Sequence, residues 1–115
     1  MVNRHSTHID NCFWIEPTMF KDHRGIFCEI FKNSHSDTSF KPVQSNYSSS
    51  KKGTLRGIHR TPYAKYVTCI AGSVYDVCVD LRPASKTHGQ YFGVELTSAK
   101  FNSLYIPAFC GHAFL

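Results

Sequence analysis

The segment "VYDVCVDL", residues 74–81, alternates strictly between two kinds of side chain. Aromatic and aliphatic residues occupy one face of the extended chain, and two carboxylates and a thiol occupy the other: Tyr75, Val77, Val79 and Leu81 against Asp76, Cys78 and Asp80. This period of two predicts a β-strand whose apolar face packs in a core. Its polar face would then meet solvent or line a ligand cavity inside a barrel.

Similar segments, separated by turn residues, extend along the chain on both sides. They cover residues 12–17, 25–31, 40–50, 54–60, 64–72, 73–83, 89–97 and 101–107. Many short strands separated at regular intervals by turn residues predict an all-β sandwich or barrel. "AGS" at 71–73 predicts a tight hairpin turn with Gly72 at a positive φ, and "SHSDTSF" at 34–40 allows one or two helical turns.

Composition limits the class of protein. The 115 residues suit one domain over 1–115, and no linker or repeat divides them. The net charge of +5 favours anionic partners, but without a basic run we expect no nucleic-acid binding, and without a long apolar run no membrane span. Five scattered cysteines without a CxxC pair predict free thiols, with Cys69 and Cys78 buried, in a reducing cytoplasm.

The segment "KGTLRGIHRTPYAKYV", residues 52–67, gathers Arg56, His59 and Lys65 within ten positions. Strict alternation would put Arg56 and His59 on opposite faces of the strand, so a shared site requires a bulge or bend at Gly57. The alternative is an exposed edge strand that carries solvated cations.

The histidines raise the question of a metal. His112 suits either a ligand or a hydrogen-bonded core residue, and with His59 and Asp80 it would complete a two-histidine, one-carboxylate site. Arg60 and Lys65 lie close to His59 in the sequence, and their charges would repel a divalent ion. We therefore predict neither a metal nor another cofactor. We expect the other histidines at the surface: His5, His8, His23, His35 and His88.

Four segments together resemble the dTDP-4-dehydrorhamnose 3,5-epimerase family, from about Phe13 to Leu115. They are "FKDHRGIFCEIF", "QSNYSSSKKGTLRGIHR", "KYVTCIAGSVYDVCVDLRPASKTHGQYFGVELT" and "LYIPAFCGHAFL". The resemblance implies a cupin-like jelly roll, a homodimer and no metal. It also implies 3,5-epimerisation of dTDP-4-dehydro-6-deoxy-glucose, a dTDP-linked 4-keto-6-deoxy sugar, in rhamnose biosynthesis.

The same resemblance implies roles for individual residues. His59 matches the general base that removes a proton next to the 4-keto group, and Lys65 matches the cation that stabilises the enolate. Three positions match residues that bind the substrate: Arg56, Gln44 and Asn46. His112 and Asp80 match a buried polar pair in the pocket wall.

The family motif DxRGxFxE holds the nucleotide from the partner subunit. Here the matching residues are Asp22, Arg24, Gly25, Phe27 and Glu29. A guanidinium can bridge phosphate and an aromatic ring can stack on a base, so the resemblance implies an active site that needs the dimer.

The sequence also departs from the family. Members continue past the position of Leu115 with a proton-donating tyrosine, an aspartate that pairs with the base, and strands that close the jelly roll, so we expect the jelly roll to be incomplete here. Alternatives are a catalytically impaired relative that binds nucleotide sugar, or a 3,4-ketoisomerase. Three tyrosines are candidate replacements for the donor: Tyr63, Tyr66 and Tyr105. Arg60 replaces a usually aromatic residue and would lower the pKa of His59 if it pointed inward.

Overall fold

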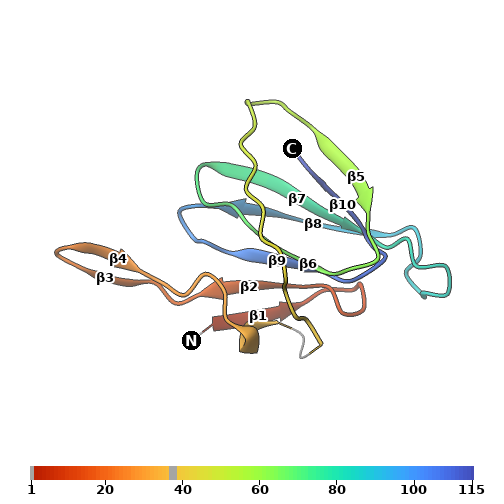
Figure 1. The fold of residues 1–115 in the computed structure, drawn as a ribbon, viewed down its shortest axis with the longest axis horizontal. Helices are drawn as coiled ribbons and strands as arrows, with labels where there is room; N and C mark the ends of the chain where they lie inside the picture. Colours follow the sequence, from red (N-terminus) through yellow and green to blue (C-terminus); the bar gives the residue numbers. More distant parts are fainter. Residues whose placement is uncertain (1, 37–38) are drawn as a thin grey trace.

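Two four-stranded antiparallel sheets face each other in the computed structural model, which describes residues 2–36 and 39–115. Sheet 1 has the order β1-β2-β9-β6, and sheet 2 has the order β5-β10-β7-β8. Figure 1 shows them as two layers, with the β3–β4 hairpin projecting from one end. The strands are β1 Val2–Ser6, β2 Phe13–Pro17, β3 Phe20–Asp22, β4 Gly25–Phe27, β5 Arg56–Arg60, β6 Lys65–Thr68, β7 Ser73–Val79, β8 Tyr91–Thr97, β9 Ser103–Ile106 and β10 Gly111–Phe114.

The main core lies between the two sheets. Leu104 and Ile106 of sheet 1 pack in one cluster with Cys78 and Leu96 of sheet 2, and all four are almost fully buried. Burial of such side chains contributes about 1.5–3 kcal/mol each, so this cluster holds the two layers together. No helix in the described part of the chain combines the length and the apolar character that a membrane span requires.

A second cluster covers the outer face of sheet 1. Phe13 of β2 stacks on Tyr105 of β9 with ring centroids 4.6 Å apart, and Phe40 packs edge-on against Tyr105 at 5.4 Å. Tyr66 of β6 packs against the same cluster. Sheet 1 is therefore covered on both faces, by the main core on one side and by these aromatic rings on the other.

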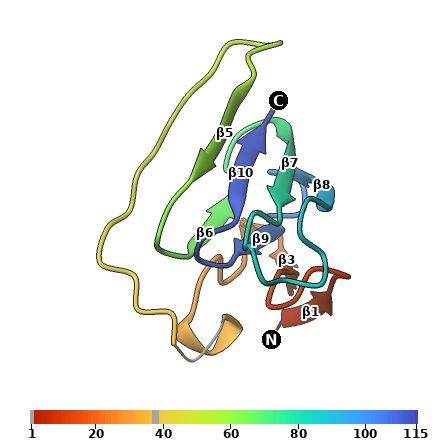
Figure 2. The same ribbon diagram turned by 90° about the vertical axis from the view of Figure 1, so that its right-hand side faces the viewer.

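The all-β prediction is confirmed, with differences in detail. The predicted strand over 40–50 does not form, and residues 41–50 are all exposed; Figure 2 shows this segment standing apart from both sheets. Pro42 removes a hydrogen-bond donor there, and the serine-rich remainder has no apolar face to bury. The predicted strand over 25–31 shortens to Gly25–Phe27, whereas β1 and β3 lack the alternation that would have indicated them.

Three local predictions need correction or completion. Gly72 has the expected positive φ, +83°, but it does not close a hairpin, because β6 belongs to sheet 1 and β7 to sheet 2. A short 3-10 helix spans Asn33–His35, while residues 37 and 38 of the predicted helical segment lie outside the described residues. His35 is buried, not at the surface.

The alternation in residues 74–81 and the burial of Cys78 are confirmed, but the apolar face is not the one that packs in the core. Asp76, Cys78 and Asp80 are fully buried, whereas Tyr75 is 47% exposed. The polar face points toward sheet 1, and its carboxylates find hydrogen-bond partners on the neighbouring strand β10 and in the loop after β7. Hydrogen-bonded carboxylates can be buried, so polarity alone did not reveal which face is inside.

The chain bends at Gly57, as a site shared by Arg56 and His59 requires. Arg56 lies opposite Phe114 and His59 opposite His112, so β5 uses one more residue than β10 over this stretch. This is a β-bulge, and Gly57 adopts a φ of +125° within it. A Cβ atom at Gly57 would lie 2.6 Å from Cβ of Ala113 and 2.7 Å from the carbonyl oxygen of His112.

We predict that Gly57→Ala lowers the free energy of unfolding by about 2–6 kcal/mol, because strained backbone and overpacking each contribute about 1–3 kcal/mol. Urea unfolding measures this. Gly72→Ala is the matched control: φ is again positive, at +83°, but no atom lies within 4 Å of the added Cβ. A smaller loss, about 1–2 kcal/mol, is expected there. Equal losses in the two variants would contradict the close packing at Gly57.

Candidate functional site

Two rows of residues cross the inner face of sheet 2. In the first row His59 of β5 lies opposite His112 of β10, which lies opposite Cys78 of β7. In the second row Arg56 lies opposite Phe114, which lies opposite Asp76. Residues directly opposite each other in antiparallel strands point to the same face. The bulge therefore brings Arg56 and His59 to the same inner face, as the sequence predicted.

A buried carboxylate–imidazole pair is the centre of this face. Nε2 of His112 donates to Oδ1 of Asp76 at 2.7 Å, and the two residues are 9% and 0% exposed. The second oxygen, Oδ2 of Asp76, is buried and has no hydrogen-bond partner among the described residues. Burial raises the pKa of Asp76, while the hydrogen bond and charge of His112 and the charge of Lys65 act in the opposite direction.

The predicted pairing of His112 with Asp80 is therefore wrong. Oδ1 of Asp80 accepts from Nε of Arg82 at 2.9 Å and from its backbone N–H at 3.1 Å. Oδ2 accepts from the hydroxyls of Ser85 and Thr87. Burial opposes ionisation of Asp80, but these hydrogen bonds outweigh it and hold its pKa well below the usual range. Asp80 thus organises the β7–β8 loop, and both of its carboxylate oxygens already accept hydrogen bonds from residues other than His112.

Lys65 approaches the same pair from sheet 1. Along β6 it shares a face with Val67, which packs against the main core, so its side chain points between the sheets. Burial lowers the pKa of Lys65, and the negative charge of Asp76 partly offsets that effect. The site thus joins an ammonium group of one sheet to a carboxylate and an imidazole of the other.

The site runs from buried to exposed across sheet 2. Asp76 and His112 are buried, whereas Arg56 and His59 on the edge strand β5 are exposed. A ligand can therefore reach His59 from solvent and still meet the buried polar groups behind it. This arrangement of imidazoles, ammonium and guanidinium can bind an anion and transfer a proton.

Other predicted substrate residues do not join this cluster within one chain. Gln44 and Asn46 are exposed and bond to each other, Nε2 to Oδ1, at 3.1 Å. Arg24 donates to Asp22 in the projecting hairpin, with NH2 to Oδ2 at 2.6 Å. Two further members of that motif lie on or just after the same hairpin: Phe27 and Glu29.

The candidate proton-donating tyrosines lie elsewhere. Tyr66 and Tyr105 belong to the cluster on the outer face of sheet 1, opposite in direction to Lys65, and Tyr63 is 61% exposed in the β5–β6 loop. Burial raises the pKa of Tyr66. The described tyrosines thus supply no proton donor that faces the cluster from the strands around it.

The metal alternative receives no support from the geometry of the described residues. They contain no group of three or more histidine, cysteine, aspartate or glutamate side chains arranged to hold an ion. His112 is bonded to Asp76, and Asp80 is bonded to Arg82 and two hydroxyls, so the proposed ligand set does not converge.

Sequence reasoning missed Asp76 as a site residue. The available signal was its place on the same face of the strand as Cys78 and Asp80, together with the need of a buried His112 for a partner. Choosing between Asp76 and Asp80 required the register of β10 on β7, which only the structure supplies.

The fold and the cluster define a cupin-like antiparallel β-sandwich protein with a polar site between its sheets. A profile of the family described as dTDP-4-dehydrorhamnose 3,5-epimerase matches residues 6–115, and the chain belongs to this family. The dTDP-4-dehydrorhamnose 3,5-epimerase of Escherichia coli K12 is 41% identical over 119 residues, which cover 95% of this chain and 63% of the relative.

Two solved structures have the same fold. The dTDP-6-deoxy-D-glucose-3,5-epimerase of Legionella pneumophila, in complex with dTDP-4-keto-L-rhamnose, is 37% identical with a TM-score of 0.92 and is matched over 99% of this chain and 64% of that one. A 3'-monoepimerase of Streptomyces bikiniensis, in complex with dTDP-quinovose, is 35% identical with a TM-score of 0.86, over 96% and 60%. The chain thus spans about three fifths to two thirds of these relatives.

We predict that the wild-type protein loses stability relative to Asp76→Asn as pH rises. Because the pKa of folded Asp76 lies above its ordinary value of 3.8, the charged carboxylate disfavours the folded state. The change begins near pH 3.8, continues through the folded-state pKa and has a slope of at most about 1.4 kcal/mol per pH unit. Urea unfolding of both proteins between pH 3 and 7 measures it.

Asp22→Asn provides a control in which the change of relative stability with rising pH has the opposite sign. The hydrogen bonds from Arg24 lower the pKa of Asp22, so the wild type should gain stability relative to this variant as pH rises. A difference between wild type and Asp76→Asn that is independent of pH would contradict the burial of an ionisable Asp76.

Proposed function

We propose that this chain carries the base and the enolate-stabilising half of an epimerase site for a dTDP-linked 4-keto-6-deoxy sugar, dTDP-4-dehydro-6-deoxy-glucose. The observation that carries the proposal is the set of polar groups between the sheets: His59 and the His112–Asp76 pair from sheet 2, and Lys65 from sheet 1. Membership of the epimerase family and relatives in complex with dTDP sugars support the choice of substrate.

The reaction begins with removal of a proton next to the 4-keto group. His59 is exposed on the edge strand, and its imidazole accepts the proton from the sugar carbon. The electron pair of the broken C–H bond moves to the 4-keto oxygen and forms an enolate. Arg56, on the same face as His59, is placed to hold the diphosphate.

Lys65 stabilises the enolate oxygen by donating a hydrogen bond from its ammonium group. Burial favours the neutral amine, so an adjacent negative charge is needed to keep the group protonated, and Asp76 supplies that charge. His112 in turn holds Asp76 in place through the 2.7 Å hydrogen bond. Asp76 is thus a positioning residue that acts through Lys65.

Inversion also requires a proton donor on the opposite face of the sugar. A second candidate function needs only the base and the cation: binding of the nucleotide sugar with proton exchange at one carbon but impaired double epimerisation. A 3,4-ketoisomerase reaction would use the same first step and differs in its product. Cytoplasmic location remains our prediction, in keeping with the free buried thiols.

We predict that the protein exchanges sugar-ring hydrogen for deuterium when it is incubated with the dTDP-4-keto-6-deoxy sugar in deuterated water. His59→Ala should slow exchange about 10²–10⁴-fold, because the general base is removed. Proton NMR measures loss of signal at the third and fifth carbons and distinguishes epimer from ketoisomer products. His88→Gln changes an exposed histidine of the β7–β8 loop and is the control. Undiminished exchange in a folded His59→Ala protein would exclude His59 as the base.

We also propose that two copies share their sites through the β3–β4 hairpin. The hairpin projects from the body and exposes Phe20, Ile26 and Phe27 by 53–66%. Exposed aromatic groups on a projecting arm suit contact with a second molecule. Arg24, held by Asp22, is then presented to the diphosphate at the partner's His59.

Mixed dimers test this arrangement. We predict that His59→Ala and Phe27→Ala proteins, each inactive alone, recover up to about a quarter of the wild-type activity when they are mixed in equal amounts and exchange subunits, because about half of the dimers are then mixed. The Phe27→Ala subunit keeps an intact base and receives an intact hairpin from its partner, which restores one of two sites. A hairpin that served its own subunit would give no recovery, and that result would refute the shared site.

A further inference from the structure

Arg60 lies on the opposite face of β5 from His59. Arg60 pairs in register with Gly111, one position from the pair of His59 with His112, so the two side chains point to opposite sides of sheet 2. Nε of Arg60 donates to the carbonyl oxygen of Phe109 at 3.1 Å, and its guanidinium carbon lies 5.0 Å from the centre of the Phe109 ring. Arg60 therefore does not point inward toward His59, which was the condition for its expected effect on that residue.

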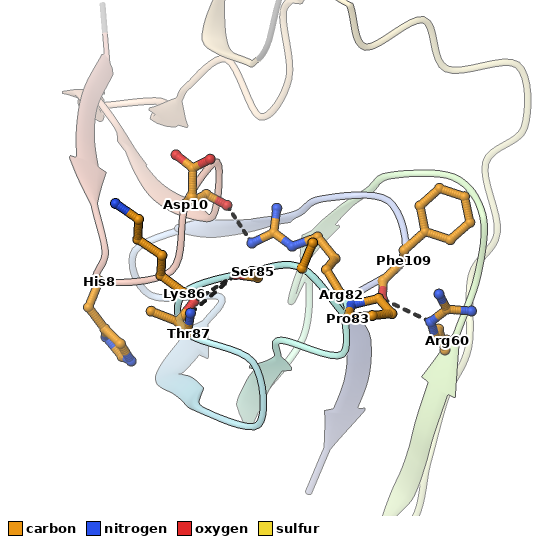
Figure 3. Close-up of a pocket in the computed structure, with 10 residues that line it drawn as sticks. His8, Asp10, Arg60, Arg82, Pro83, Ser85, Lys86, Thr87 and Phe109 are labelled. Atoms are coloured by element: carbon orange, nitrogen blue, oxygen red, sulfur yellow. Dashed lines mark hydrogen bonds between the residues drawn. The ribbon is translucent and has the colours of Figure 1, made fainter.

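Arg60 instead lines a pocket of about 980 Å³ at the end of β5. Four separate segments form it: the end of β5, the turn before β10, the β7–β8 loop and the turn between β1 and β2. Figure 3 shows Arg60 and Phe109 on one side and Lys86 with Asp10 on the other. Pro83 and Ala84 add apolar surface between them.

The pocket is held in shape before any ligand binds. Asp80 accepts hydrogen bonds from Arg82, Ser85 and Thr87, which fixes the β7–β8 loop. NH2 of Arg82 also donates to the carbonyl oxygen of Asp10 at 2.9 Å and ties this loop to the β1–β2 turn. A preformed pocket loses less conformational entropy on binding than a flexible one.

Its charge is positive. Arg82 is neutralised by Asp80, but neither Arg60 nor Lys86 has a carboxylate partner within 4 Å among the described residues. Asp10 is the one acidic residue in the described lining. The terminal nitrogens of Arg60 remain available for an anion because only Nε is used by Phe109.

We infer that this pocket is a second binding site, for a phosphorylated small molecule of about nucleotide size. The guanidinium of Arg60 binds the phosphate in the two-pronged geometry that it also offers to carboxylates, and Lys86 adds positive potential from the opposite side. The ring of Phe109 and the apolar Pro83 cover the organic part of the ligand. Because Arg60 and His59 point to opposite faces of β5, this site differs from the candidate active site and can be occupied while that site is empty.

Adenosine diphosphate is a suitable probe, measured by calorimetry and by ¹H–¹⁵N NMR shifts of the full chain. We expect shifts in residues 84–87 and in Phe109, and at least a tenfold loss of affinity in the double variant R60Q/K86Q. K41Q/K100Q removes the same charge from two exposed positions and should retain the affinity within about threefold. Affinity should also fall as salt concentration rises.

Arg56→Gln distinguishes the two sites. It alters the candidate active site and should leave the shifts of residues 84–87 unchanged, whatever its effect on catalysis. Equal affinity in folded R60Q/K86Q and K41Q/K100Q would overturn the inference. So would shifts confined to the inner face of sheet 2 that disappear in Arg56→Gln.

Discussion

Burial of the Asp76 carboxylate between the two sheets is the constraint on which the site depends. A carboxylate with no exposed surface requires hydrogen bonds or nearby positive charge, because transfer of an isolated ion from water is very unfavourable. His112 supplies the hydrogen bond from the neighbouring strand, and Lys65 supplies charge from the opposite sheet. The buried Asp76 carboxylate therefore accounts for the positions of two candidate site residues, His112 and Lys65.

Asp80, the second carboxylate of the alternating segment, has different hydrogen-bond partners. Asp80 is bonded by residues of the following loop and has no part in the site on the inner face. The two carboxylates of one alternating segment therefore have different structural roles. Asp76 organises the groups between the sheets. Asp80 fixes the loop that borders the pocket of Arg60 and Lys86. The two polar regions are thus linked through one alternating segment, β7 and the residue that follows it.

Much of the fold followed from patterns of period two and from turn residues. Most predicted strands exist, and the bulge at Gly57 was required by the argument that Arg56 and His59 act together. The pairing of His112 was wrong because Asp76 and Asp80 are equivalent in the alternation, and only the register of β10 on β7 distinguishes them. The segment 41–50 was wrongly predicted as a strand because sequence patterns do not show whether a neighbouring strand is available.

The amino-acid sequence by itself determined the β-rich architecture, the motifs that resemble the epimerase family, and the presence of a histidine and two cations in one short segment. Local side-chain spacing and residue type were sufficient for these inferences. The tertiary structure decided which face of residues 74–81 is buried, which carboxylate meets His112, and that Arg60 points away from His59. These features depend on contacts between residues far apart in the chain, which strand register and sheet packing establish together.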